Sequence, residues 1–328
     1  MPTTLIVLET IFLILSILIV LAVLTTAVFV LFHVMRTKRE DKEDPKAGLK
    51  ITDLGQELAD RVQRVRRSML PKKEWKKLPK ETHPKSHEST VFVLDFHPKL
   101  RAREVQALRK EIDIITQVAT PKDEVLVRID SVGGTVTGYG QAASQLLRVH
   151  NLGIPLTICV DEVAASGGYM CAAVADKIIA APFAYIGSIG VAAGVPNVVG
   201  LMNKIGVRYL ELTAGENKRT LTPFSEFTPE KEAIERERLQ AIHEAFKDLI
   251  KKRRPNLDID RVADGNYWLA INAKELGLVD LIQTSDEYLI QQSKLNPRFV
   301  CCDTHDSAKC VDLAYEMTLC NAPDCRIA

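Results

Sequence analysis

A serine followed by two glycines lies where a predicted strand gives way to a predicted helix. Ser166 comes shortly after the β-type run 156–160 and just before a stretch of small residues. Backbone N–H groups in the first turn of a helix are unpaired, and the helix dipole favours negative charge there. Ser166 is therefore a candidate nucleophile in a candidate oxyanion site. The structural alternative is that Ala-Ser-Gly-Gly serves close packing of a helix on a strand.

Two further glycines offer a second wall for such a site. Gly133 and Gly134 follow the predicted strand 124–129, as Gly167 follows Ser166. The carboxyl ends of parallel strands meet at one edge of a sheet, where ligands bind. Because glycine has no side chain, its N–H group can approach a substrate carbonyl closely. The glycines therefore predict oxyanion donors beside the serine.

The general base is harder to find in the sequence. None of the seven histidines stands in a motif beside an acid and a strand end, so a Ser-His-Asp triad is not indicated. A lysine can replace histidine when burial disfavours its charged form. Lys218 follows the predicted strand 207–212 and is the candidate, although composition alone marks it as a surface lysine.

The elements that must position these residues alternate between strand and helix. Their spacing predicts an α/β fold with a mainly parallel core. The longest soluble helix begins at Thr228 and Pro229 and ends before Pro255, with acids in its early turns and bases in its last. We expect strands at 91–96, 124–129, 155–160, 177–181 and 207–212, and helices at 105–118, 138–149, 195–205 and 273–276.

An uncharged apolar run near the start predicts a membrane anchor. Residues 11–32 are long enough to cross a bilayer as a helix, and too long for the apolar region of a signal peptide. Lys and Arg follow this run but do not precede it, which places the next domain on the cytoplasmic side. Residues 49–70 have helical periodicity, and the basic linker after them suits lipid headgroups better than nucleic acid, since Trp75 is its one aromatic residue.

Charge and cysteine content exclude several other functions. The formal net charge is +1, so no overall field attracts nucleic acid. No glycine-rich nucleotide motif is present, and no cofactor is expected. Cys159 and Cys171 are predicted to be core residues. The other five cysteines fall within 301–325 at spacings that fit no zinc pattern, so we expect disulfides or an unstructured tail there rather than a metal.

Several motifs resemble the signal peptide peptidase A family of serine proteases, closest to its SohB branch. They are Val-Ala-Ala-Ser-Gly-Gly-Tyr at 163–169, Gly-Ser-Ile-Gly at 187–190 and Gly-Leu-Val-Asp at 277–280. The resemblance implies a ClpP/crotonase-type fold of repeated ββα units, preceded by one transmembrane helix. It also implies a Ser/Lys dyad, with Ser166 as nucleophile and Lys218 as general base. Ser188 matches the serine that orients the lysine, and Gly134 and Gly167 match the oxyanion donors.

The resemblance also sets expectations for organisation and substrate. The anchor would occupy 1–35, an amphipathic helix and basic linker 36–89, the protease domain 90–290 and a Cys-rich tail 291–328. The expected activity is that of a serine endopeptidase in a bacterial cell membrane, acting on peptides such as signal-peptide remnants. In the family, the serine and the lysine of one site come from different units, so a homo-oligomer is expected. Relatives whose catalytic domain is exported would place this domain on the opposite side of the membrane from the one that the Lys and Arg count favours.

Two other functions remain open from the sequence. A membrane-anchored scaffold or binding protein could keep the fold without catalysis. A crotonase-like acyl-CoA enzyme is the third possibility, and the predicted anchor disfavours it.

Overall fold

The computed structural model describes two main stretches of the chain, residues 89–215 and 217–293. It also describes residues 298–303 and several short pieces, which are Leu21, Leu24, Thr25, 50–53, Arg64, Arg67 and 69–71. The chain divides into two units, Met1–Ala47 and Gly48–Ala328. Most of the predicted anchor, 11–32, and most of the predicted tail lie outside the described residues. Within the described part, no helix is long and apolar enough to span a membrane.

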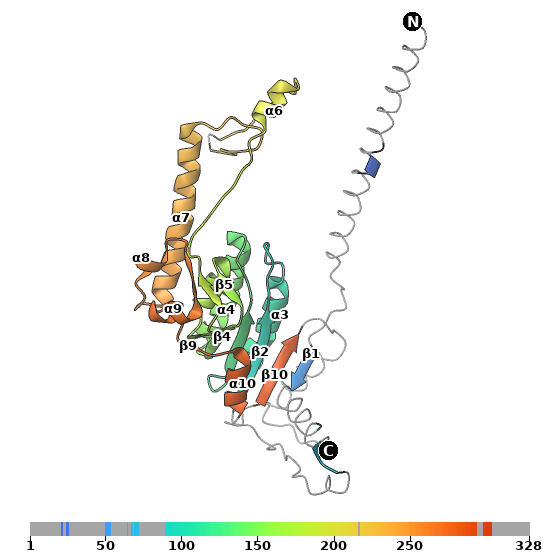
Figure 1. Ribbon diagram of the computed structural model, residues 1–328, viewed down its shortest axis with the longest axis vertical. Helices are drawn as coiled ribbons and strands as arrows, with labels where there is room; N and C mark the ends of the chain where they lie inside the picture. Colours follow the sequence, from blue (N-terminus) through green and yellow to red (C-terminus); the bar gives the residue numbers. More distant parts are fainter. Residues whose placement is uncertain are drawn as a thin grey trace. The chain divides into compact units, whose positions relative to one another are not determined.

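A seven-stranded sheet forms the centre of the larger unit (Figure 1). All neighbouring strands are parallel except the outermost pair, β1 and β10. This arrangement confirms the predicted mainly parallel α/β core and fits a ClpP-like fold. In spatial order the strands are β1 (Lys50–Asp53), β10 (Arg298–Asp303), β2 (Thr90–Phe96), β3 (Glu124–Ile129), β4 (Leu156–Val160), β6 (Lys177–Ala180) and β9 (Leu281–Ile282).

Side chains alternate between the two faces of this sheet, and each face packs against helices. On β2, Phe92, Leu94 and Phe96 belong to the main core. That core also takes in the buried faces of α3 (Val105–Val118), α4 (Val136–Asn151) and α5 (Gly167–Ala172). The intervening Val91 and Val93 belong to a smaller cluster with Tyr288 of α10 (Ser285–Ser293). The continuous apolar strands of the sequence are therefore buried on both faces.

A second, three-stranded sheet lies against the carboxyl edge of the first. It consists of β5 (Val163–Ala165), β7 (Tyr185–Gly187) and β8 (Tyr267–Leu269), with β5 and β7 parallel. A parallel bridge between Ser131 and Ala164 links it to the end of β3. Helix α9 (Ala270–Glu275) follows β8 directly. This small sheet was not predicted, because strands of three residues are too short to show a period.

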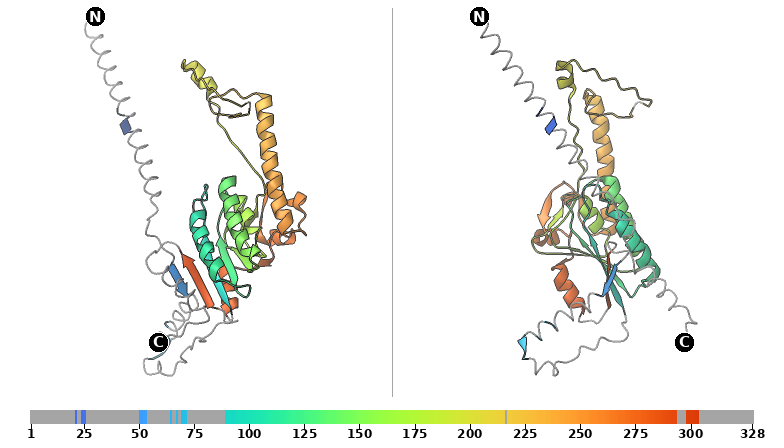
Figure 2. Two further views of the ribbon diagram at one scale, coloured as in Figure 1. Left: turned by 180° about the vertical axis from the view of Figure 1, so that it is seen from behind. Right: turned by 90° about the vertical axis from the view of Figure 1, so that its right-hand side faces the viewer.

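Helix α7 (Pro229–Arg253) supports an extended arm. The Thr228 hydroxyl caps its start by accepting from the Lys231 N–H at 3.4 Å. Its buried residues, Phe246 and Ile250, both lie in its last third. Figures 1 and 2 show the segment 191–228, with α6 (Val199–Lys204), running away from the sheet toward the start of α7. The short α8 (Ile259–Val262) follows α7. The arm is therefore carried by one end of a long helix.

Three predicted elements differ in the structure. The segment 207–212 is not a strand, because no strand among the described residues lies beside it to form hydrogen bonds. The predicted helix 195–205 shortens to α6. At the other end of the chain, residues 50–53 form β1 rather than the beginning of a helix, since β10 offers them an edge to pair with. With β1 and β10, the sheet takes strands from both sides of the range 90–290.

Candidate active site

Ser166 sits in a strained turn between β5 and α5. Its backbone has φ 52° and ψ −120°, a conformation that residues other than glycine rarely adopt. Its N–H donates to the Gly187 carbonyl at 2.8 Å, and its carbonyl accepts from Met170 at 2.9 Å. Such strain costs about 1–3 kcal/mol and persists where surrounding contacts hold it in place. A strained turn from strand to helix is typical of an exposed nucleophile.

Gly133 packs directly against this serine. Its φ is +93°, and a Cβ added there would lie 2.8 Å from Ser166 Cβ and from the Gly167 nitrogen. Its N–H already donates to Ser131 Oγ at 3.1 Å. Gly133 therefore allows the close approach of the two turns, and its own N–H is not available to a substrate.

Gly134 and Gly167 carry backbone N–H groups that could serve as oxyanion donors. The N–H groups of Gly134 and Gly167 have no acceptor among the residues that the structure describes. Gly167 is the first residue of α5, where an N–H has no partner within the helix. A side chain at Gly134 would meet the Leu100 carbonyl at 2.0 Å, so only glycine fits. Gly167 follows Ser166 directly, and Gly134 follows the glycine that packs against Ser166, so both donors belong to the two turns at the serine, as an oxyanion site requires.

Tyr139 and Ser131 support these turns, and the sequence alone predicts neither role. The Tyr139 hydroxyl lies 2.6 Å from Ser131 Oγ and 3.0 Å from the Pro98 carbonyl. Burial raises the pKa of Tyr139, so its hydroxyl stays protonated. A Cβ at Gly167 would lie 2.5 Å from the Tyr139 ring. In the sequence, Tyr139 is simply one apolar position of a helix, and nothing local signals its contact with the serine turn.

Ser188 directly follows β7, just as Ser166 directly follows the neighbouring strand β5. Ala165 and Gly187 are paired in register on the parallel strands β5 and β7, so Ser166 and Ser188 follow at the same edge. Adjacent strands lie about 4.8 Å apart. Ser188 also has a positive φ of 51°, and its N–H donates to Asn266 at 2.6 Å. The structure therefore brings Ser166, Ser188, Gly134 and Gly167 to one edge.

Lys218 is not brought to that edge within the chain. It lies on the arm, in a tight turn in which its N–H donates to the Gly215 carbonyl at 3.2 Å. Its side chain is exposed, and no hydrogen bond or ion pair joins it to another described residue. The prediction that it follows a strand is wrong, because 207–212 is irregular. The single chain thus presents the serine and the lysine on separate parts of its surface.

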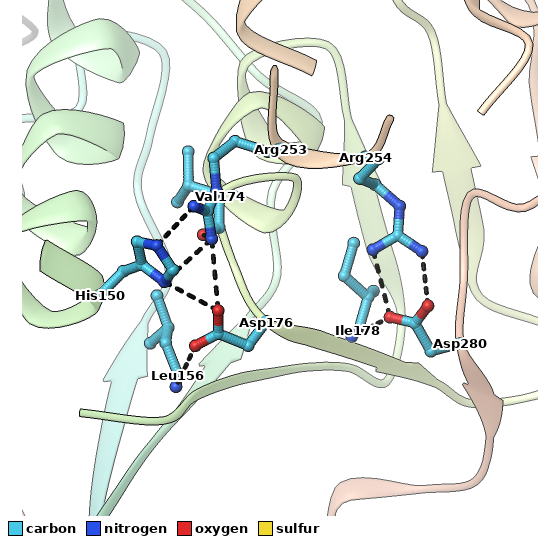
Figure 3. Close-up of polar contacts among 8 residues, drawn as sticks. All are labelled: His150, Leu156, Val174, Asp176, Ile178, Arg253, Arg254 and Asp280. Carbon is cyan, nitrogen blue, oxygen red and sulfur yellow. Dashed lines mark hydrogen bonds and ion pairs between the residues drawn. The ribbon is translucent and has the colours of Figure 1, made fainter. Parts of the chain in front are cut away.

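His150 is excluded as the base by its position. It lies at the end of α4, where its Nδ1 is 2.8 Å from Asp176 Oδ1 and its Nε2 is 2.6 Å from Arg253 Nη1 (Figure 3). Arg253 Nη2 also lies 3.0 Å from Nδ1, so both ring nitrogens contact Arg253 or Asp176. Asp176 in turn accepts from the N–H of Leu156, the first residue of β4. His150 is therefore at the amino edge of the sheet, opposite Ser166.

Residues at the amino edge of the sheet also hold the end of α7. Arg254 Nη2 lies 2.6 Å from Asp280 Oδ1, and Asp280 Oδ2 accepts from Ile178 at 2.7 Å (Figure 3). Burial alone would lower the pKa of Arg254, but the pairing with Asp280 outweighs it and the net change is upward. These pairs line a hollow of about 530 Å3. Because each arginine faces an aspartate, the hollow has no net charge with which to bind an anion, and its groups instead clamp α7 to the sheet.

Breaking this clamp is expected to destabilise the protein. Arg254→Met would leave the Asp280 carboxylate without its cation, at a cost of roughly 2 kcal/mol of unfolding free energy, because Asp280 keeps part of its solvation. Urea unfolding followed by circular dichroism measures the change. Lys252→Met is the matched control, since Lys252 is exposed on the same turn. Equal stability of the two variants would contradict the clamp.

The two cysteines in the core are not alternative nucleophiles. Cys159 and Cys171 are fully buried, and burial raises the pKa of each thiol to about 12. A thiol is nucleophilic only as its thiolate. Nucleophilic attack by these two thiols is therefore disfavoured. Ser166 remains the best-placed candidate nucleophile among the described residues.

The fold and this edge define an α/β protein with a site suited to acyl transfer. Residues 149–296 match the model of Peptidase family S49, and residues 5–146 match that of Peptidase family S49 N-terminal. The chain belongs to peptidase family S49, in its SohB branch.

Named relatives agree with this assignment. "Probable protease SohB" of Haemophilus influenzae is 43% identical over 266 residues, covering 75% of each chain. "Probable protease SohB" of Buchnera aphidicola subsp. Acyrthosiphon pisum is 48% identical over 208 residues, covering 63% of this chain and 62% of the relative. "Putative protease MJ0651" of Methanocaldococcus jannaschii is 33% identical over 186 residues, covering 54% of this chain and 58% of the relative.

Proposed function

We propose that this S49 peptidase is a membrane-anchored serine endopeptidase, with Ser166 as nucleophile and Lys218 as general base. The observation that carries the proposal is the strained turn at Ser166, flanked by the unpaired N–H groups of Gly134 and Gly167. A half-buried serine beside two N–H groups that no described residue accepts from suits attack on a peptide carbonyl. The neighbouring Ser188 is in place to hold an incoming lysine amine.

The reaction proceeds by acyl transfer in two halves. The neutral Lys218 amine takes the proton of Ser166 Oγ as that oxygen bonds to the carbonyl carbon, and the two N–H groups bind the oxyanion. The C–N bond then breaks, and Lys218 returns the proton to the leaving amine. In the second half, Lys218 takes a proton from water as the water oxygen bonds to the ester carbonyl carbon. The bond from that carbon to Ser166 Oγ then breaks, Lys218 returns the proton to Oγ, and the acid product leaves.

The lysine of each site comes from a second copy of the chain. A lysine works as a base near neutral pH when burial disfavours its charged form, and Lys218 is exposed in the single chain. Its arm also exposes a set of large apolar side chains, which a stable monomer rarely leaves in water. These are Val195, Leu201, Ile205, Val207, Tyr209, Leu210, Leu212 and Phe224. Docking this arm on another copy covers them and carries Lys218 to that copy's serine.

The sequence and the family support the proposed anchor and substrates. Residues 11–32 cross the bacterial cell membrane once, which keeps the protease near membrane-derived peptides such as signal-peptide remnants. The Lys and Arg residues after this run favour a cytoplasmic catalytic domain. Small or apolar residues are expected at the cleavage point, as the family resemblance implies. No nucleic acid, metal or cofactor enters the reaction as written.

Fluorophosphonate labelling of the detergent-solubilised full-length protein tests the proposal. The probe phosphonylates an activated serine, so wild type is expected to label, while Ser166→Ala does not and Lys218→Ala labels at least about 100-fold more slowly. Equal labelling of wild type and Ser166→Ala would exclude Ser166 as nucleophile. A folded wild type that does not label at all would favour a scaffold instead. Hydrolysis of an acyl-CoA but no peptide would favour a crotonase-like enzyme.

A further inference from the structure

One arginine of α7 forms hydrogen bonds to both sides of the turn that carries Lys218. Arg238 Nη2 donates to the Asn217 carbonyl at 2.7 Å. Its Nη1 donates to Thr220 Oγ1, also at 2.7 Å. One planar guanidinium therefore holds the main chain just before Lys218 and a side chain just after it, in the two-pronged manner that arginine allows.

The Glu235 carboxylate completes this hydrogen-bond network. Thr220 Oγ1 donates to the Glu235 carboxylate, and Arg238 Nη1 also lies 2.6 Å from Glu235 Oε1. Glu235 and Arg238 are three residues apart on α7, so they share one face of the helix. The threonine hydroxyl thus accepts one bond and donates one, which uses both of its roles.

Apolar packing does not hold the described residues of this turn in place. Among the described residues from 211 to 220, Thr220 is the one that is buried, at 5% exposure. The turn itself bends through two positive φ angles, at Gly215 and Arg219. Its orientation therefore depends on polar contacts rather than on a core: the hydrogen bonds among Arg238, Thr220 and Glu235, and the ion pair of Arg219 with Glu211 at 3.0 Å.

We propose that Arg238 is a positioning residue for Lys218, acting through Asn217, Thr220 and Glu235. The inference rests on the proposed function, because it gives Lys218 the role of base. The arm is long and its lysine must reach a serine of another copy, so small rotations of the turn displace the amine. A displacement of about 1 Å in a reacting group can cost 100-fold in rate.

Replacing the arginine by lysine separates positioning from charge. Arg238→Lys keeps the positive charge but cannot bond to Asn217 and Thr220 together. In the full-length protein we expect a fall of about 30-fold in kcat and in the fluorophosphonate labelling rate of Ser166, with KM within about 2-fold and the same oligomer mass. Arg236→Lys is the matched control, since Arg236 is exposed on the same helix. It is expected to behave like wild type.

Thr220 provides the second test. Thr220→Ser keeps the hydroxyl and is expected to retain most activity, whereas Thr220→Val keeps the shape and is expected to lose kcat as Arg238→Lys does. The reverse order would mean that Thr220 acts by packing, which overturns the proposal. It is also overturned if Arg238→Lys matches Arg236→Lys, or if its loss of activity comes with a smaller oligomer. If wild-type labelling does not depend on Lys218, the proposed base fails first, and that result is separate from these.

Discussion

A mixture of two inactive variants, Ser166→Ala and Lys218→Ala, is expected to regain activity. If each site takes its serine from one copy and its lysine from the next, random co-assembly gives about a quarter of the sites both wild-type groups. Each variant alone forms sites that all lack one group. The expected result is therefore a rise from background to about a quarter of wild-type peptidase activity, measured after the two proteins are unfolded or dissociated and reassembled together.

The double variant provides the control for this experiment. Ser166→Ala/Lys218→Ala mixed with either single variant can form no complete site, so that mixture is expected to stay at background. Co-assembly is shown independently by different affinity tags on the two variants. Proven co-assembly without any regained activity would mean that serine and lysine meet within one chain, by a movement of the arm that folds Lys218 onto its own Ser166.

Local periodicity was enough to predict most of the core. The helix expected at 105–118 and the strand expected at 124–129 match α3 and β3, because each has a long apolar pattern bounded by turn residues. The errors fall where an element depends on its partner. The segment 207–212 has the composition of a strand but pairs with no strand in the described part of the chain, whereas residues 50–53 become a strand by pairing with β10. Pairing between distant segments leaves no local pattern in the sequence.

The site was predictable to a smaller extent. The turn at Ser166 and the glycines after β3 could be found from their residue types, but the pairing of β5 with β7 that sets Ser188 beside Ser166 could not. The roles of Ser188 and Lys218 came from family resemblance and stay predictions. Tyr139 and Arg238 escaped notice because each acts through contacts with remote main chain. Residue type pointed to Ser166 as the candidate nucleophile, and only the fold revealed the contacts that hold its turn.

Gly133→Ala is expected to abolish the activity while sparing most of the fold. Its added methyl group would lie 2.8 Å from Ser166 Cβ, the Gly167 nitrogen and the Ala165 carbonyl, so the serine turn and one oxyanion donor must move. The positive φ of +93° adds strain of about 1–3 kcal/mol, which leaves a marginally stable domain still folded. Because an oxyanion donor is worth about 100-fold or more, labelling of Ser166 by a fluorophosphonate should fall at least that far.

Gly140→Ala makes the same chemical change seven residues later and is expected to have the opposite effect on stability. Gly140 lies inside α4, and a Cβ there meets nothing within 4 Å. Alanine in a helix interior is favoured over glycine by about 0.5–1 kcal/mol, so this variant should unfold at higher urea and label at the wild-type rate. If Gly133→Ala also labelled at that rate, the two turns could not be packed as closely in the working enzyme as they are here. The serine would then owe its reactivity to Lys218 and α5 without support from the Gly133 turn.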